Sequence, residues 1–263
     1  MGEVAESHDP YGSRWCGPGT PLILFQLDYD TAPSLYLPLD RRALQSYAEA
    51  LRRCWSLLGL QKGDVAAIFD YGTSPLSYLA SSAFTPYLKR GAAEGLGCWT
   101  VCNDGIASMS QRAVEILKFV RPRLLFVRAD CLEPLAVEIE TRLRRLSRFT
   151  EALVVSDNEC LLSRADQQRF ERRLGLPIYR LLRVDVAMFL ATECPECHLL
   201  HSWEDLYGVE TVEDDHRDPG NLYLVITNWF ARCCPTVRYL SQIRASLAGR
   251  GCPRSPGDLR IAA

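Results

Sequence analysis

The chain has 263 residues, 48% of them hydrophobic and 24% charged, so it is long enough for one or two domains with a buried core. Its formal net charge of −2 argues against a role in binding nucleic acid or an acidic membrane surface. The arginine-rich stretch at 141–149 spreads around a solvated helix, so it forms no basic patch for nucleic acid.

The sequence indicates a cytoplasmic protein. Its first ten residues, MGEVAESHDP, lack the apolar core of a signal peptide, and no apolar run reaches the roughly 18 residues of a membrane span. The eleven cysteines are scattered through predicted helices and strands, as buried free thiols in a reducing compartment are. A strained disulfide between the neighbours Cys233 and Cys234 is not expected. We expect no nucleic acid and no membrane among its partners.

Residues 1–40 are irregular apart from a predicted strand at 21–27, and regular structure follows. A helix is predicted at 41–58 from its apolar face, with Gly59 ending it. Further strands are predicted at 65–69, 98–102, 123–127, 152–156 and 177–182. They alternate with helices at 75–95 (broken near Pro86), 108–120, 132–146 and 163–174. This alternation predicts right-handed β-α-β units and a parallel sheet.

After about residue 190 the pattern changes to strands at 208–212, 221–227 and 236–240, with a turn at 214–220. We therefore predict an α/β fold: a parallel, flavodoxin-like layered sheet with helices on both faces, followed by a small β-rich subdomain. The predicted division is an irregular N-terminal segment and strand (1–40), an α/β subdomain (41–190) and a β-rich subdomain with a truncated C-terminus (191–263).

Ligands of open parallel sheets bind at the carboxyl ends of the strands, and here those ends are rich in small and polar residues. A ligand crevice is therefore expected there. No phosphate loop and no dinucleotide fingerprint is present. All four histidines lie outside the predicted α/β region, so no Ser-His-Asp triad is indicated and catalytic residues stay unassigned.

The stretch ECPECHLLHSWED, residues 193–205, concentrates reactive side chains. Cys194, Cys197 and His198 form the Cys-x-x-Cys-His pattern of haem c attachment, which takes place outside the cytoplasm. With His201 and a distant cysteine, the same residues are half of a zinc site. The third interpretation is a loop of free thiols without a metal.

The order of segments resembles the adenylate-forming (acyl-CoA synthetase, AMP-binding) superfamily, in particular its phenylacetate–CoA ligase branch. The stretches that carry the resemblance are LQSYAEALRRCWSLLGLQKGDVAAIFDYG, TECPECHLLHSWEDLYGVETVED and GNLYLVITNWFARCCPTVRYLSQI. It covers about residues 40–250. It implies substrate-binding roles at Tyr71, Gly72, Asp185, Arg238 and Tyr239.

Each of these roles has a structural alternative. Gly72 permits a tight turn and Tyr71 packs on the core. Asp185 caps a strand end instead of supporting magnesium, and Arg238 pairs with a carboxylate such as Glu210 instead of an anionic ligand.

The chain also departs from the family at the positions that bind ATP. The segment GPGTP (17–21) has neither the serine and threonine nor the lysine of the phosphate-binding loop, and Asp185 at best replaces the glutamate of the magnesium–ATP site. Ile243 stands where the family has the aspartate that binds ribose, and no lysine follows residue 118. Adenylation requires an aligned, charge-neutralised triphosphate, so we predict that the chain does not adenylate by itself.

The resemblance also implies a metal set, because some relatives pair the Cys and His of the Glu-Cys…Leu-His segment with a later Cys-Pro-Cys-Gly. Here Cys194 and His201 match the first half. GCPRSPG supplies Cys252, but Arg254 replaces the second cysteine, and Cys197 or His198 would complete the four. Structural zinc is the candidate cofactor, and the loop of free thiols without a metal is its alternative; ATP, AMP and CoA are not counted among the ligands.

Three functions follow from the resemblance. The first is an accessory protein that binds a small aryl or acyl carboxylate or its thioester in a biosynthetic pathway. The second is an enzyme that transfers or condenses an acyl group activated elsewhere. The third is a divergent ligase completed by a partner subunit; a homodimer is the other expected association.

Overall fold

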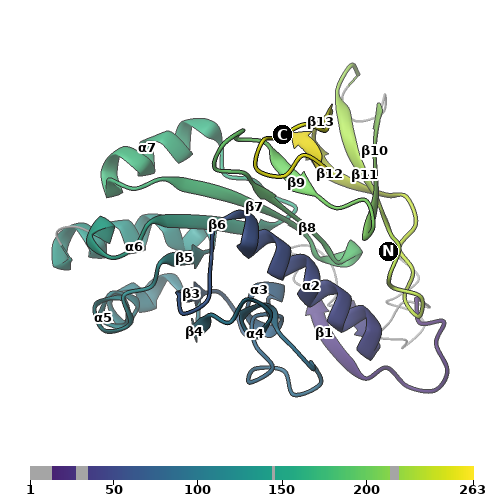
Figure 1. Cartoon of the computed structure of the whole chain (residues 1–263), viewed down its shortest axis with the longest axis horizontal. Helices are drawn as coiled ribbons and strands as arrows, with labels where there is room; N and C mark the ends of the chain where they lie inside the picture. Colours follow the sequence, from purple (N-terminus) through teal and green to yellow (C-terminus); the bar gives the residue numbers. More distant parts are fainter. Residues whose placement is uncertain (1–13, 28–34, 144–145, 214–218) are drawn as a thin grey trace.

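The structure is a computed structural model that describes residues 14–27, 35–143, 146–213 and 219–263. Within these residues the strands form three sheets (Figure 1). β1 (Ile23–Leu27) and β2 (Leu35–Leu39) form an antiparallel pair. β10 (Tyr207–Glu213), β11 (Leu222–Asn228) and β12 (Tyr239–Arg244) form a second antiparallel sheet. The third and largest sheet has nine strands.

The parallel part of the large sheet contains β3 (Val65–Phe69), β4 (Trp99–Asn103), β5 (Leu124–Val127), β6 (Ala152–Asn158) and β7 (Ile178–Val184). Their order across the sheet is β7-β6-β5-β3-β4, and every pair is parallel. This is the 2-1-3-4-5 order of flavodoxin-like folds. The predicted α/β class with a parallel, flavodoxin-like sheet is confirmed.

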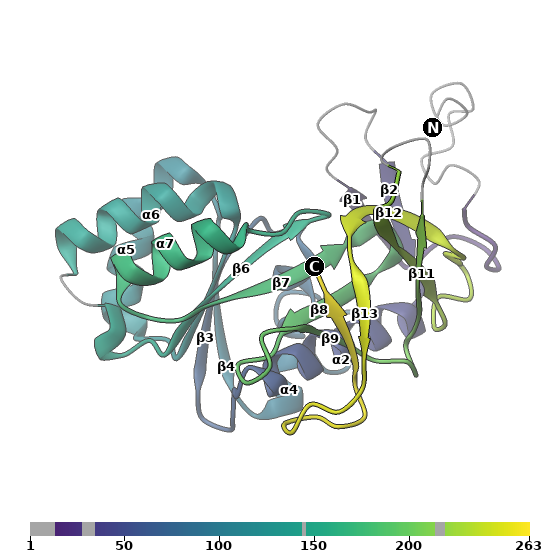
Figure 2. The ribbon, with the colours of Figure 1, turned by 90° about the horizontal axis from the view of Figure 1, so that it is seen from above.

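Helices cover both faces of this sheet, as predicted (Figure 2). One face packs on α5 (Ser110–Val120), α6 (Ala129–Arg142) and α7 (Arg164–Leu174). The other packs on α2 (Arg41–Leu57), α3 (Pro75–Tyr78) and α4 (Ala92–Leu96). Side chains alternate along a strand. In β3, Ile68 therefore belongs to the core under α2, and Phe69 to the core under the α5 group.

The local sequence of α2 determines where this helix begins, which face it buries and where it ends. Asp40 caps its first turn by accepting a hydrogen bond from the backbone N–H of Ala43 over 2.7 Å. Its buried stripe includes Tyr47, Leu51 and Trp55, at the three- and four-residue spacing of one helical face. Gly59, at φ +93°, supplies the left-handed backbone just past its end.

The prediction of helix across 75–95, broken near Pro86, is wrong for most of this range, because only α3 and α4 are helical there. The chain between them turns back on itself, and the Glu94 carboxylate accepts hydrogen bonds from the backbone N–H groups of Ser82 and Gly91. A side chain at Gly91 would stand 2.5 Å from the Cα of Ser81. The chain folds back between α3 and α4 because Gly91 allows this close approach and Pro86 does not fit within a helix.

The strands that follow β7 were only partly predicted. β8 (Phe189–Glu193), β9 (Leu200–Ser202), β14 (Leu259–Ala262) and β13 (Ser246–Gly249) extend the large sheet as antiparallel neighbours. β12 begins at Tyr239, later than the predicted strand at 236–240. Residues 214–218 of the predicted turn lie outside the described residues. The division of the chain at 40 and 190 stays a prediction.

No helix in the described ranges combines the length and the apolar character needed to cross a bilayer.

Candidate functional site

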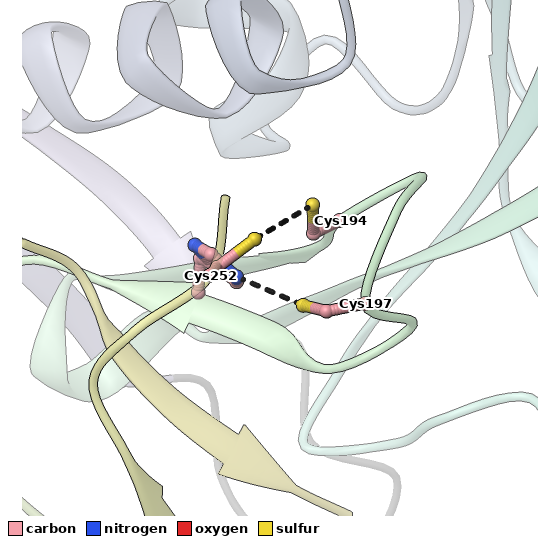
Figure 3. Close-up of side chains that lie close together, drawn as sticks. Cys194, Cys197 and Cys252 are labelled. Atoms are coloured by element: carbon pink, nitrogen blue, oxygen red, sulfur yellow. Dashed lines mark hydrogen bonds between the residues drawn. The ribbon is translucent and has the colours of Figure 1, made fainter. Parts of the chain in front are cut away.

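Four predicted metal ligands come together at the antiparallel end of the large sheet. Cys194 directly follows β8, Cys197 lies in the turn before β9, and His201 lies within β9. Cys252 comes from the connection between β13 and β14. β14 pairs with β9, placing Arg260 opposite His201, so the sheet brings this connection beside the β8–β9 turn. Figure 3 shows the three cysteine side chains turned toward a common centre.

The geometry of the four ligand atoms fits a tetrahedral metal ion. All four lie within 4.8 Å of one another. The sulfurs of Cys194 and Cys252 are 3.7 Å apart, and the Cys197 sulfur is 3.2 Å from Nε2 of His201. Zinc–sulfur bonds of about 2.3 Å in a tetrahedron place two sulfurs about 3.8 Å apart. Three of the ligands are fully buried and Cys197 is half-buried, as in a closed structural site.

Backbone N–H groups donate hydrogen bonds to the cysteine sulfurs of this cluster. The N–H of Glu196 donates to the Cys194 sulfur over 3.4 Å. Burial disfavours the thiolate of Cys252, but hydrogen bonds from the N–H groups of Arg254 and Ser255 outweigh it and lower the pKa of Cys252. Burial raises the pKa of the Cys197 thiol to about 11, although the N–H of Leu199 opposes this shift. A bound cation would remove the remaining protons.

Asp258 completes the arrangement and was missed in the sequence. Its Oδ2 lies 3.1 Å from Nδ1 of His201, whose ring is fully buried. A carboxylate on one ring nitrogen fixes the tautomer and leaves Nε2 to bind a metal. His198 points elsewhere: its side chain is 66% exposed and lies 3.8 Å from Glu193. Cys197, and not His198, is therefore the fourth side chain of the cluster.

A second group of polar side chains lies at the carboxyl ends of the parallel strands. Arg183, near the end of β7, donates to Oδ2 of Asp70 over 3.0 Å and also contacts Ser74. Its Nε lies 3.7 Å from Oδ1 of Asp185, which directly follows β7. Arg183 and Asp70 are buried. Burial disfavours the charge on Arg183, but Asp185 and Asp70 outweigh it and raise the pKa of the guanidinium.

The predicted substrate-binding residues divide between this polar group and its surroundings. Asp185 belongs to it, and its backbone N–H donates to Oδ1 of Asn158 over 2.9 Å. Tyr71 follows Asp70 and is 37% exposed, and the Arg128 guanidinium lies 4.0 Å from the centre of its ring. Gly72 is exposed, and nothing lies within 4 Å of the place a side chain would take.

Arg238 and Tyr239, two further predicted substrate-binding residues, each form hydrogen bonds with a glutamate of the protein. Arg238 donates to both carboxylate oxygens of Glu210, over 2.7 and 2.8 Å. The hydroxyl of Tyr239 donates to Oε1 of Glu159 over 2.6 Å. Each of the two residues therefore pairs with an acidic side chain of the protein. Ile243, at the position where the resemblance calls for a ribose-binding aspartate, is buried.

Two hollows border these sites. A small one at the ends of β3 and β5 has a cavity volume of about 10 Å³, room for a single water, and its lining includes Phe69, Gly105 and Cys131. A larger one of about 280 Å³ lies beside the metal ligands and contains Arg52, Arg53 and Arg254. Carboxylates lie next to these three guanidinium groups: Glu49, Asp205 and Glu196. Neighbouring carboxylates therefore compensate the positive charges of these three arginines.

Comparison with solved structures identifies the fold. 2-Hydroxyisobutyryl-CoA ligase, in an open conformation with 2-HIB-AMP and CoA, aligns with a TM-score of 0.78 and 18% identity over 99% of this chain and 60% of that one. Anthranilate CoA ligase with anthranoyl-AMP aligns with a TM-score of 0.61 and 11% identity over 90% of this chain and 46% of that one. O-succinylbenzoate coenzyme A synthetase from Bacillus subtilis, with AMP, aligns with a TM-score of 0.56 and 12% identity over 90% of this chain and 48% of that one.

The predicted resemblance to the adenylate-forming superfamily is confirmed at the level of the fold: the structural neighbours are acyl-CoA and aryl-CoA ligases of that superfamily, and the chain has their fold. The phenylacetate–CoA ligase branch stays a prediction. It spans little more than half the length of the 2-hydroxyisobutyryl-CoA ligase structures. No protein-family model and no curated protein matches the sequence.

Proposed function

We propose that this chain binds an aryl or acyl carboxylate, or its thioester, without adenylating it, as an accessory protein in the cytoplasm. The fold supports the ligand class, since its neighbours hold acyl or aryl adenylates and CoA. The ligand would lie at the carboxyl ends of the parallel strands, beside Tyr71, Gly72 and Asp185.

The ion pair between Arg183 and Asp185 is the observation that carries the proposal. A carboxylate that supports magnesium–ATP must offer its charge to the metal. The Asp185 carboxylate lies 3.7 Å from a buried guanidinium that also binds Asp70, so its charge is already compensated. Ile243 has a hydrocarbon side chain and cannot accept a hydrogen bond from a ribose hydroxyl. Both features favour binding over adenylation.

We also propose that Cys194, Cys197, His201 and Cys252 hold a structural zinc ion. Four protein ligands leave no open coordination position, which is typical of structural and not catalytic zinc. The ion would fasten the β8–β9 turn to the β13–β14 connection. With all four positions taken by protein ligands, the ion would stabilise the fold and take no part in a reaction.

Two measurements on the purified chain test the proposed function. Carboxylate-dependent pyrophosphate exchange is expected to be absent, while a thermal-shift screen shows stabilisation by aryl or acyl acids or CoA thioesters and none by ATP. Tyr71→Ala should abolish that stabilisation. Tyr87→Ala, which truncates a similarly exposed tyrosine, should retain it.

Other outcomes favour other functions. Robust exchange by the chain alone would overturn the proposal. Exchange that appears only after a second polypeptide from the host is added would indicate a ligase completed by a partner subunit. Turnover of an added acyl-CoA would indicate an acyl-transferring enzyme. Light scattering on the same sample separates a monomer from the homodimer that the sequence leaves open.

A further inference from the structure

Two cysteines that are far apart in the sequence meet on the surface, away from the proposed metal ligands. Cys16 lies in the segment before β1, and Cys233 lies in the connection between β11 and β12. The backbone N–H of Cys16 donates to the carbonyl of Cys233 over 2.7 Å. A Cβ atom at the adjacent Gly17 would stand 2.9 Å from both Cβ and Sγ of Cys233. The Cys233 side chain therefore lies against the backbone next to Cys16.

This arrangement suits a disulfide. The 2.7 Å hydrogen bond from the N–H of Cys16 to the carbonyl of Cys233 brings the two backbones together, as a disulfide needs, because disulfides join residues whose Cα atoms are about 4.4 to 6.8 Å apart. Cys16 is exposed and Cys233 is partly exposed, so an oxidant can reach both. Cys234, the immediate neighbour, is buried, and a bond between adjacent cysteines would strain the backbone.

We propose that Cys16 and Cys233 form a reversible disulfide when the protein meets hydrogen peroxide. The Cys16 thiol first loses its proton to solvent. Its thiolate attacks one peroxide oxygen, the O–O bond breaks, and the leaving hydroxide takes up a proton from solvent, so that a sulfenic acid and one water result. The Cys233 sulfur then attacks the Cys16 sulfur and gives up its proton, and the S–O bond breaks to release a second water. Two thiols are oxidised and one peroxide is reduced.

The surroundings assign the order of these steps. The carboxylate of Asp40 beside Cys233, together with burial, raises the pKa of that thiol. Fewer Cys233 side chains are then thiolates at neutral pH, and the thiolate is the nucleophile toward peroxide. Cys16 is also the more exposed of the two. Cys16 therefore reacts first, and Cys233 resolves the sulfenic acid.

The bond would secure the N-terminal segment beside the strand ends. Arg14 in this segment donates to the carbonyl of Val186 over 2.8 Å and to Oγ1 of Thr236 over 3.2 Å. Val186 immediately follows Asp185, so oxidation would hold Arg14 against the turn that carries Asp185. The disulfide itself does not depend on the proposed ligand or on zinc.

Peptide mapping of the full chain tests this inference. Reduced protein is treated with hydrogen peroxide, the remaining thiols are alkylated, and the digest is analysed by mass spectrometry. A linked peptide pair containing Cys16 and Cys233 is expected, and dithiothreitol should release it. Cys16→Ser and Cys233→Ser should each abolish the pair. Cys234→Ser should retain it.

A second measurement keeps the test independent of folding defects in the variants. Limited proteolysis of the unsubstituted chain should cut the segment around Arg14 more slowly after oxidation than after reduction. The inference is overturned if the Cys16–Cys233 pair is absent from oxidised protein, if Cys233 is linked to Cys234 instead, or if oxidation leaves the cutting rate unchanged.

Discussion

The Tyr239 hydroxyl lies 2.6 Å from Oε1 of Glu159, and this hydrogen bond joins the three-stranded sheet to the end of β6 in the large sheet. The backbone N–H of Gln242 donates to the other oxygen of the same carboxylate over 3.1 Å. One acidic side chain therefore holds two residues of β12. It gives Tyr239 a structural task at a position where the resemblance implies substrate binding.

Tyr239→Phe removes the donor and should lower the free energy of unfolding by about 1.5 to 3 kcal/mol, the usual net contribution of a hydrogen bond to a charged group. Urea denaturation measures this. In the double variant with Glu159→Gln, the loss of stability should be smaller than the sum of the two single losses, because the two residues share one contact. Tyr87→Phe is the control at an exposed tyrosine. An unchanged stability in Tyr239→Phe would show that the contact is unimportant.

Arg183→Met should be strongly destabilising, because it leaves Asp70 buried without its partner. Breaking a buried ion pair from one side costs about 3 to 5 kcal/mol. Arg112→Met, at an exposed position on α5, should change stability little. Urea denaturation of both variants gives the comparison. Equal stabilities would contradict the assignment of Arg183 as the centre of the polar group.

Protein purified without added zinc should contain about one zinc ion per chain by elemental analysis. Cys194→Ser should lose it, and Cys160→Ser, at an exposed cysteine, should retain it. Removing the metal with a chelator should lower Tm by at least about 5 °C, since metal binding contributes to folding. A metal-free protein with an unchanged Tm would leave the free-thiol loop as the better interpretation.

Asp258→Asn tests the carboxylate behind His201. Losing such a partner typically weakens metal affinity by about 10- to 100-fold. Competition with a coloured chelator measures the affinity. Asp104→Asn, at an exposed position, serves as the control. If Asp258→Asn binds zinc as tightly as the unsubstituted chain, the contact to His201 only supports packing.

Asp157 should make stability depend on pH. Burial raises its pKa, although the backbone N–H of Ala129 donates to the carboxylate and opposes the shift. The folded state then keeps this proton to a higher pH than the unfolded chain does. Its contribution to stability is present below the unfolded pKa of about 3.9 and is lost as pH rises through the folded value.

Asp157→Asn removes this titration. Its stability relative to the unsubstituted chain should therefore increase with pH from about pH 4 upward and level off above the folded pKa. Urea denaturation across that range measures the difference. A difference that is flat or falls with pH would contradict the direction given for Asp157.

The parallel sheet could be predicted because its strands are apolar on both faces. In β5 all four residues are buried, and a short apolar run between amphipathic helices is typical of such a strand. The strands after β7 carry a weaker signal. β9 has three residues, and its partner β14 comes much later in the chain. Pairing over such a distance cannot be read from local periodicity.

The metal set was predicted from cysteine and histidine spacing and a resemblance, whereas its supporting carboxylate was not. Asp258 follows a Pro-Gly stretch and has no recognisable spacing to His201. Arg183 had a signal that was not used. A charge within a buried, apolar strand must be paired, so the sequence YRLLRV calls for acidic partners. Which acids these are depends on the fold, since Asp70 ends a different strand.

The position of β14 between β13 and β9 has a consequence for synthesis on the ribosome. β9 is translated well before its partner, so the nascent chain exposes an unpaired strand edge in the interval. The Cys252 ligand emerges in the same late stretch. This edge of β9 therefore stays open until β14 has been made and has paired with it.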